Sequence, residues 1–222
     1  MRKTALLAGA TGLIGSHLLP LLLASERYSK VIVVGRRPLP QTHPKLVQVV
    51  TELDDLEAHR PKLIADDVYC CLGTTRRQAG SKAAFRKVDF GYVVQLAALA
   101  AGNFAAQFMV VSSLGADAES RVYYNRVKGE MEAAVRQAPF RAIHIFRPSL
   151  LLGERVTLPG QAPRLGERIT AALLALARPL LRGPLRPYRA VPAATVAAAM
   201  LRAAEDDGGG IRVHEATALT GR

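Results

Sequence analysis

The chain contains no tryptophan and only two cysteines among its 222 residues. Cys70 and Cys71 are adjacent in an apolar stretch, where an extended chain would point them to opposite faces. A disulfide between them is therefore not expected, and the sequence offers no other pair of cysteines. These absences exclude a small disulfide-stabilised secreted scaffold and favour a reducing compartment, so we expect a cytoplasmic protein.

Long apolar runs are absent as well. Ser16, His17 and Pro20 interrupt the only candidate, which falls short of the roughly 18 residues that suggest a membrane span. The first 26 residues, MRKTALLAGATGLIGSHLLPLLLASE, still have the basic start and apolar run of a secretory signal. If the segment were a signal, the even spacing of Gly9, Gly12 and Gly15 would be accidental, and its removal would take away the first strand of the sheet that the rest of the chain predicts. We therefore expect the segment to stay in the protein, and we expect no membrane association.

Acidic residues are scarce, with 18 Asp and Glu against 30 Lys and Arg, which gives a formal net charge of +12. The basic residues are dispersed and no basic run is interleaved with aromatic residues, so nucleic acid is not an expected partner. Arginines are concentrated between residues 155 and 189, which fits either a solvated face or a surface for an anionic substrate or partner. No cluster of His, Cys and acidic residues has the spacing of a metal site.

Short apolar runs alternate with helical patterns along the rest of the chain. The runs at residues 4–10, 31–35, 46–50, 67–73, 107–113 and 142–148 predict strands, and the patterns at 13–25, 81–101 and 121–137 predict helices. This alternation predicts an α/β fold with a doubly wound, mostly parallel sheet of the Rossmann type. We expect one dinucleotide-binding domain over residues 1–222. Residues 154–222 would cap the substrate side with helices at 166–181 and 191–204 and a strand at 211–216.

Three glycines at three-residue intervals follow the first predicted strand and open the first predicted helix. In that setting Gly9 permits a tight turn, Gly12 lets the backbone approach a pyrophosphate, and Gly15 allows close packing of the helix on the strand. The N-terminus of the helix offers unpaired N–H groups to the anion. Cofactor contacts are expected along this turn, at Gly9, Thr11, Gly12, Leu13, Ile14 and Gly15.

Arg36 and Arg37 stand at the end of the second predicted strand, with no acidic residue nearby. An NAD-preferring site usually has a carboxylate there, which binds the 2′-hydroxyl of the ribose. A guanidinium instead offers a fork of donors suited to a phosphate. The pair therefore favours the 2′-phosphate of NADP(H), with NAD as the alternative cofactor and solvent-facing loop residues as the alternative interpretation.

Ser112 and Ser113 lie at the carboxyl end of the fifth predicted strand, and YNRVK places Tyr124 and Lys128 on one face of the next helix. A tyrosine is a poor acid or base near neutrality, because its ordinary pKa is about 10. A neighbouring ammonium favours the phenolate, and a serine hydroxyl can hold a substrate oxygen. After a glycine-rich first turn, this set predicts catalysis or cofactor binding rather than a surface pair.

The motifs GATGLIG, VGRR, FRKVDFGYVVQLAALAA, VVSSLGA, YNRVK and FRPSLLLG occur in the order typical of one family. Through them the chain resembles a short-chain dehydrogenase/reductase with the glycine spacing of the extended branch. Within that branch it is most similar to the atypical Tat-interacting-protein-like group. The resemblance covers residues 4 to 153.

The resemblance implies roles at matching positions. Tyr124 would be the acid/base, Lys128 would bind the nicotinamide ribose and lower the pKa of the tyrosine, and Ser113 would orient the substrate carbonyl. Ser112 takes the last role if the register slips by one residue. The remaining cofactor contacts would come from Leu53, Leu72, Gly73, Thr74, Arg147, Pro148 and Ser149.

Asp89 departs from the pattern, because the extended branch commonly has an asparagine there, tied to a proton-relay water or to helix geometry. An ionised carboxylate accepts hydrogen bonds but donates none, so the relay does not carry over intact. The first hypothesis is an NADP(H)-dependent oxidoreductase acting on a small carbonyl or alcohol. An NADP(H)-binding sensor without appreciable turnover is the alternative, and a nucleotide-sugar epimerase or dehydratase ranks third. A protein partner or a homo-oligomer stays open.

Overall fold

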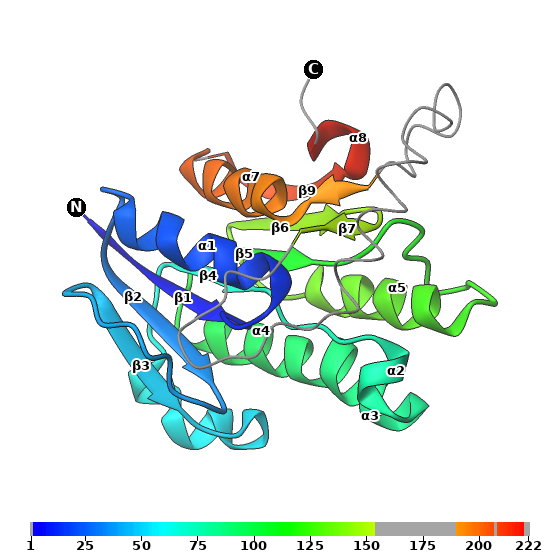
Figure 1. Ribbon diagram of the computed structural model, residues 1–222, viewed down its shortest axis with the longest axis horizontal. Helices are drawn as coiled ribbons and strands as arrows, with labels where there is room; N and C mark the ends of the chain where they lie inside the picture. The colour runs from blue at the N-terminus through cyan, green and yellow to red at the C-terminus, as the bar shows by residue number, and fades with distance from the viewer. Residues whose placement is uncertain (1, 154–189, 207, 220–222) are drawn as a thin grey trace.

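The computed structural model describes residues 2–153, 190–206 and 208–219 (Figure 1). Its centre is a seven-stranded sheet in which neighbouring strands are parallel throughout and follow the order β3-β2-β1-β4-β5-β6-β9. The strands are β1 (Lys3–Ala8), β2 (Tyr28–Gly35), β3 (Leu46–Val50), β4 (Asp67–Cys70), β5 (Gln107–Val111), β6 (Ala142–Arg147) and β9 (Gly210–Glu215). The predicted doubly wound parallel sheet is confirmed.

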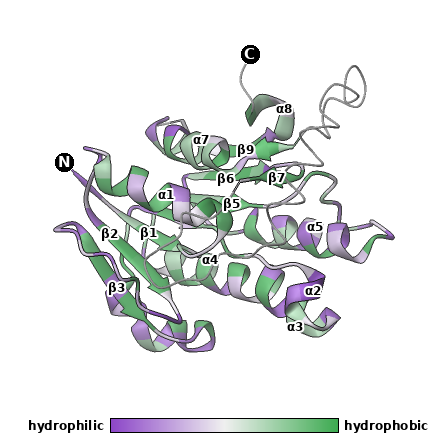
Figure 2. Ribbon diagram, in the orientation of Figure 1, coloured by the Kyte–Doolittle hydropathy of each residue, from purple (hydrophilic) through white to green (hydrophobic). Residues whose placement is uncertain are grey.

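Helices cover both faces of the sheet, as Figure 1 shows. On one face lie α1 (Leu13–Ala24) and α7 (Ala193–Glu205), and on the other lie α4 (Tyr92–Gly102), α5 (Tyr123–Val135) and the 3₁₀ helix η1 (Leu53–Lys62). Successive strand residues enter opposite cores: Leu7 and Tyr69 pack toward α1 and α7, whereas Leu6 and Val68 pack toward α4 and α5. The inner strands are therefore apolar on both sides, which Figure 2 shows as green arrows.

The long helix predicted at 81–101 is divided. It consists of α3 (Lys82–Arg86), a π-helical stretch η2 (Lys87–Gly91) and α4. Two short elements, η1 and α2 (Arg76–Ala79), were not predicted, and a small parallel pair joins β7 (Leu151–Leu152) to β8 (Val191–Pro192). A last helical turn, α8 (Ala216–Leu219), follows β9. The helix predicted at 166–181 lies outside the described residues, so the proposed cap over 154–222 stays a prediction.

The strand order indicates at which edge of the sheet a ligand would bind. From β1 the chain winds outward through β2 to β3, and from β4 it winds the opposite way through β5 and β6. The loops that follow β1 and β4 therefore diverge at the carboxyl edge, which is where open α/β sheets bind their ligands. Across the described ranges, none of the helices has the length and apolar character to span a membrane.

Candidate functional site

The turn after β1 is built for close backbone approach. Gly9 has a φ of 86°, and a Cβ atom there would lie 2.5 Å from the carbonyl oxygen of Cys71. A side chain is excluded both by the left-handed backbone and by the neighbouring strand end. The Gly12 N–H donates to the Gly9 carbonyl at 2.9 Å, which closes the turn.

Gly15 packs α1 directly onto this turn, since a Cβ atom at Gly15 would lie 2.1 Å from the Gly9 carbonyl oxygen. Gly12 precedes the helix as its N-cap and supplies no side-chain cap. The first N–H groups of α1, including those of Leu13 and Ile14, have no partner within the helix. The Ile14 side chain is buried in the core, so only the backbone of this residue is available to a ligand. An uncapped helix start against a glycine turn fits a bound pyrophosphate.

A cleft of about 700 Å³ opens beside the turn. It runs between the loops that follow β1, β2 and β4, at the carboxyl edge of the sheet. Nine of the predicted cofactor residues line it: Gly9, Thr11, Gly12, Arg36, Arg37, Leu53, Leu72, Gly73 and Thr74. The structure thus gathers into one cleft residues that are dispersed over the first third of the chain.

Arg36 and Arg37 are exposed on the wall of this cleft, directly after β2. Within the part of the chain that the structure describes, neither guanidinium forms an ion pair with an acidic side chain. Two forked donor groups therefore face the cleft without a protein anion to neutralise them. This suits a phosphate-bearing ligand.

Sequence reasoning missed a second wall of the cleft. It is formed by residues of α2, α3, η2 and α4, namely Gln78, Ala79, Ala84, Lys87, Val88 and Tyr92. The helix α2 carries a detectable start and stop: the Thr75 hydroxyl caps it by accepting the Gln78 N–H at 3.2 Å, and Gly80 ends it with a φ of 78°. A threonine followed by glycine at this spacing could have revealed the element.

Lys128 is not among the residues that line the cleft, but it lies in a buried ion pair close to Gly73, which does line it. Its Nζ atom is 2.8 Å from Oδ1 of Asp89, and the two side chains are 3% and 1% exposed. Burial alone would lower the pKa of Lys128, but the charges of Asp89 and Tyr124 raise it above its ordinary value. Asp89 thus takes a direct ionic contact with the lysine rather than the relay position expected of an asparagine.

The other predicted catalytic residues come from the end of β5 and the start of α5. Ser112 and Ser113 follow β5, and among the described residues neither buried hydroxyl has a hydrogen-bond partner. Buried hydroxyls are normally paired, so these two are available to a ligand. Tyr124 is half-buried on the first turn of α5, with its ring 5.4 Å from that of Phe85. Lys128 lies one turn further along the same helix.

Arg147, which the resemblance implies as a cofactor contact, forms ion pairs within the protein. Its guanidinium is bound by Glu132 and Glu215, so the side chain serves the packing of β6. Pro148 is buried, and its carbonyl accepts the N–H of Leu114 at 2.9 Å. Ser149 is half-buried beyond the end of β6. None of these three residues lines the cleft at the glycine turn.

The two cysteines provide no nucleophile. Burial raises the pKa of Cys70 to about 12 and that of Cys71 well above its ordinary value. Both thiols are therefore neutral at physiological pH, even though Cys71 lines the cleft.

Residues 5–211 match the NAD dependent epimerase/dehydratase family. The chain belongs to this family. Its members are NAD-dependent, which agrees with a glycine turn, an uncapped helix start and a cleft at the switch point of the sheet. The resemblance to short-chain dehydrogenases/reductases is confirmed.

Two groups of relatives are at least 30% identical to this chain in sequence. Protein HTATIP2 from Rattus norvegicus is 39% identical over 157 residues, which cover 69% of this chain and 64% of that protein. The chain thus matches less than two thirds of the rat protein's length. Protein FMP52-1, mitochondrial, from Scheffersomyces stipitis is 34% identical over 163 residues, or 71% of each protein. Several further yeast FMP52 proteins also carry the word mitochondrial in their names, so the expectation of a cytoplasmic location is contradicted.

Solved structures agree on the fold. The Bordetella bronchiseptica enzyme WbmH, in complex with NAD+, superposes with a TM-score of 0.69 at 16% identity, covering 97% of this chain and 76% of that one. UDP-glucose 4-epimerase from Thermotoga maritima, with UDP-glucose, gives a TM-score of 0.67 at 16% identity, with 96% of this chain and 76% of that one covered. At such identities the likeness establishes the Rossmann-type architecture and leaves the substrate open.

Proposed function

We propose that the chain is an NADP(H)-dependent oxidoreductase that transfers hydride between the nicotinamide and a small carbonyl or alcohol. One observation carries the proposal: a single cleft joins the glycine turn, the two unpaired arginines and the loop above Lys128. A Cβ atom on Gly73, which lines this cleft, would lie 3.8 Å from the Lys128 ammonium. The loop that lines the cofactor cleft therefore lies next to Lys128, which supports the proposal that the cofactor-binding and proton-handling groups act together.

The residues at the outer part of the cleft would hold the cofactor. The turn at Gly9 and Gly12, with the start of α1, would receive the pyrophosphate through backbone N–H groups. Arg36 and Arg37 would bind the 2′-phosphate, which distinguishes NADP(H) from NAD(H). Leu53 and Leu72 supply an apolar surface in the same cleft that suits an adenine ring.

Ser113, Tyr124 and Lys128, which are not among the residues that line the cleft, would handle the proton. Bound NADP(H) supplies or accepts the hydride. The hydroxyl of Ser113, buried and without a protein partner among the described residues, would hold the substrate oxygen. Tyr124 would give a proton to that oxygen or remove it, and Lys128 lies one turn further along the same helix.

The alternative is an NADP(H)-binding sensor without appreciable turnover. The contact between Lys128 and Asp89 favours it, because a carboxylate 2.8 Å from the ammonium offsets the positive charge that would assist Tyr124. Both functions share the cofactor site. They differ in whether a substrate is turned over. One experiment therefore tests the shared cofactor site, and a second tests turnover.

The first experiment titrates the protein with NADPH and NADH. A phosphate bound by an arginine fork contributes about 1.5–3 kcal/mol, so wild type should prefer NADPH by at least roughly tenfold. Arg36→Glu should abolish that preference. Arg2→Glu, an exposed arginine ahead of β1 at the opposite edge of the sheet, should leave it unchanged. Equal weak binding of both cofactors, unaffected by Arg36→Glu, would sink the NADP(H) assignment.

The second experiment follows NADPH oxidation with a panel of carbonyls and NADP+ reduction with a panel of alcohols. Tyr124→Phe should remove turnover while NADPH still binds. Tyr123→Phe is the matched control, because the Tyr123 hydroxyl donates to the Lys82 carbonyl at 2.9 Å and is occupied there. If wild type and Tyr124→Phe are equally inactive and both bind NADPH tightly, the sensor interpretation replaces the enzyme.

A further inference from the structure

The ion pair between Asp89 and Lys128 is enclosed by several elements. Asp89 comes from η2 and Lys128 from α5, and the lysine Nζ also lies 3.4 Å from the carbonyl oxygen of Val111 at the end of β5. The side chains are 1% and 3% exposed, so water neither solvates nor screens the two charges. A pair of this kind is stable only while both partners are present.

The second oxygen of Asp89 reaches the cofactor cleft. Oδ2 accepts the backbone N–H of Thr74 at 2.9 Å, and Thr74 lines the cleft with Gly73. A Cβ atom on Gly73 would lie 3.4 Å from Oδ1 of Asp89, so the pair sits directly beneath this loop. One carboxylate therefore fixes both the lysine and a segment of the cleft wall.

The π-helical stretch explains how Asp89 reaches this position. Lys87 and Val88, within the same stretch, line the cleft, whereas Asp89 is buried behind it. A π-helical turn inserts an extra residue into a helix and changes the direction of the side chains that follow. Such turns are frequent at functional sites. Here the π-helical stretch places Lys87 and Val88 in the wall of the cleft and the carboxylate of Asp89 behind that wall.

The groups that face Lys128 include one carboxylate. Asp89 contributes it from η2, Tyr124 faces the lysine from α5 itself, and Cys70 faces it from β4. Burial raises the pKa of Cys70 to about 12, so its thiol is neutral at physiological pH. Among these groups, Asp89 is the counter-charge that keeps the buried ammonium protonated.

We propose that Asp89 is a positioning residue, which keeps Lys128 charged inside the protein and holds its ammonium beneath the Gly73 and Thr74 segment of the cofactor cleft. The inference rests on the proposed function for what Lys128 does toward the cofactor. It adds that the charge of Lys128, and with it cofactor affinity at alkaline pH, depends on Asp89.

The first test uses the protein without ligand. Asp89→Asn keeps the shape of the side chain but leaves a buried ammonium without a counter-charge, which lowers the pKa of Lys128 in the folded state. The folded variant then binds fewer protons than the unfolded chain, so its deficit in Tm against wild type should be largest near pH 7. The deficit should shrink by about half or more by pH 9.5. A deficit that stays constant over this range would mean a merely structural role and would overturn the proposal.

Asp67→Asn is the matched control. Asp67 is also fully buried in an ion pair, 2.8 Å from Arg27, but it lies at the amino end of β4, away from the cleft. An arginine does not deprotonate in this range, so the deficit of this variant should not shrink as the pH rises. A parallel pH trend in both variants would contradict a specific role for Lys128.

The second test measures NADPH affinity between pH 7 and pH 9.5. Wild-type affinity should change little, whereas Asp89→Asn should lose about tenfold or more as Lys128 deprotonates. A constant ratio of the two affinities would overturn the proposal. If wild type does not bind NADPH at all, the proposed function fails, and the Tm test still decides whether Asp89 maintains the charge of Lys128.

A double variant covers the case in which Asp89→Asn does not fold. Replacing both partners, as Asp89→Asn with Lys128→Met, removes the uncompensated charge. The double variant should be more stable at pH 7 than Asp89→Asn alone and should lose the pH trend in Tm. A double variant that is no more stable at pH 7 would show that charge is not what Asp89 supplies, and the proposal would fall.

Discussion

Arg147 on β6 and Glu132 on α5 form a two-point ion pair. The Nε–Oε1 distance is 2.9 Å and the Nη2–Oε2 distance is 2.7 Å, and Nη1 of the same guanidinium reaches Glu215 on β9 at 3.1 Å. The hydrogen bonds that Arg147 donates to Glu132 raise the pKa of Arg147 above its ordinary value. The contact joins a helix to the strands β6 and β9, and it pairs the half-buried guanidinium of Arg147 with two carboxylates of the protein.

Replacing Glu132 with glutamine should therefore destabilise the protein. Glu132 is 2% exposed, so the variant loses a charge-assisted pair that solvent does not replace, at a cost of about 2 kcal/mol in the free energy of unfolding. Urea denaturation measures the loss. Glu57→Gln is the control, because the side chains of its pair with Arg60 are 66% and 36% exposed, so solvent screens the pair and the loss should be much smaller than that of Glu132→Gln. Equal losses in both variants would refute the structural role of Arg147.

The second prediction concerns a steric clash that the substitution Gly15→Ala would cause. A methyl group in Gly15→Ala would meet the Gly9 carbonyl at 2.1 Å, and backbone atoms cannot move aside as a flexible side chain can. We expect a loss of about 3 kcal/mol or failure to fold, and folded protein should bind NADPH at least tenfold more weakly, by about 1.4 kcal/mol or more. Thermal unfolding and NADPH titration test this.

Gly91→Ala is the control for Gly15→Ala. Gly91 is also in a helical region, with a φ of −57°, but the atom nearest to a methyl group added there would be the Arg86 carbonyl oxygen at 4.0 Å. Alanine favours helix over glycine by up to about 1 kcal/mol, so this variant should be neutral or slightly stabilised. If Gly15→Ala and Gly91→Ala lose the same stability, the loss comes from replacing a glycine in a helical backbone and not from the contact with Gly9.

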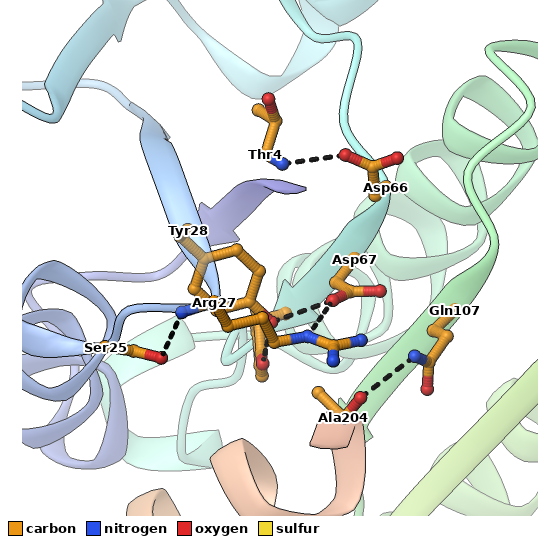
Figure 3. A network of polar contacts seen from close by, with 9 residues as sticks. Thr4, Ser25, Arg27, Tyr28, Asp66, Asp67, Gln107 and Ala204 are labelled. Atoms are coloured by element: carbon orange, nitrogen blue, oxygen red, sulfur yellow. Dashed lines mark hydrogen bonds and ion pairs between the residues drawn. The ribbon is translucent and has the colours of Figure 1, made fainter. Parts of the chain in front are cut away.

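A buried network at the amino edge of the sheet gives a third prediction (Figure 3). Oδ2 of Asp67 accepts hydrogen bonds from Arg27 Nε and the Tyr28 hydroxyl, each at 2.8 Å, and the Tyr28 hydroxyl lies 2.7 Å from that of Tyr69. Burial, with the charge of Asp67, raises the pKa of both tyrosines, so they stay neutral donors. Since Tyr28 donates to Asp67, Tyr69 donates to Tyr28.

This order of donors predicts unequal costs. Tyr28→Phe removes a donor from a buried carboxylate and should cost about 2–3 kcal/mol, whereas Tyr69→Phe removes a neutral bond and should cost about 1 kcal/mol. Their double variant should be less destabilised than the sum of the two, because the bond between the hydroxyls is counted in both single variants. Urea unfolding of the three proteins measures the cycle. A larger loss for Tyr69→Phe than for Tyr28→Phe would reverse the assigned donors.

Local patterns predicted the fold well because both faces of the inner strands are buried. The strand at 46–50 has the predicted limits, and α7 begins at Ala193, two residues after the predicted start at 191. The start of β2 was missed, because Tyr28 to Lys30 lacks the apolar run that marks the rest of the strand. The π-helical stretch was also missed, since its amphipathic pattern does not differ from that of an ordinary helix over five residues.

The site was predictable where a motif fixes local geometry. Gly9, Gly12 and Arg36 line the cleft because each follows a strand at its carboxyl end. The partner of Asp89 was not predictable, since an ion pair between η2 and α5 depends on how two distant segments pack. The same holds for Arg147, whose neighbours in FRPSLLLG give no sign of Glu132 or Glu215.

The last prediction concerns acid stability and rests on His144 and His214. His144 on β6 is 1% exposed, and its Nδ1 atom lies 3.1 Å from Nε2 of His214 on β9. Burial, with the charges of His214 and Arg212, lowers the pKa of His144 to about 4, and burial lowers that of His214 as well. Both rings are therefore neutral in the folded protein at pH 7, and the unfolded chain takes up their protons first as the pH falls.

The stability that neutral His144 provides is fully present above its unfolded pKa of about 6.5 and is lost as the pH falls toward 4. At pH 5 the loss should be about 2 kcal/mol relative to pH 7.5, on top of any contribution from carboxylates. His144→Gln should flatten this part of the curve, while His43→Gln, at an exposed position, should keep the wild-type slope. Urea unfolding of the three proteins at pH 7.5, 6.5, 5.5 and 5 compares the slopes. If the wild-type and His144→Gln curves run parallel over this range, protonation of His144 does not contribute to acid unfolding, and the loss belongs to other groups.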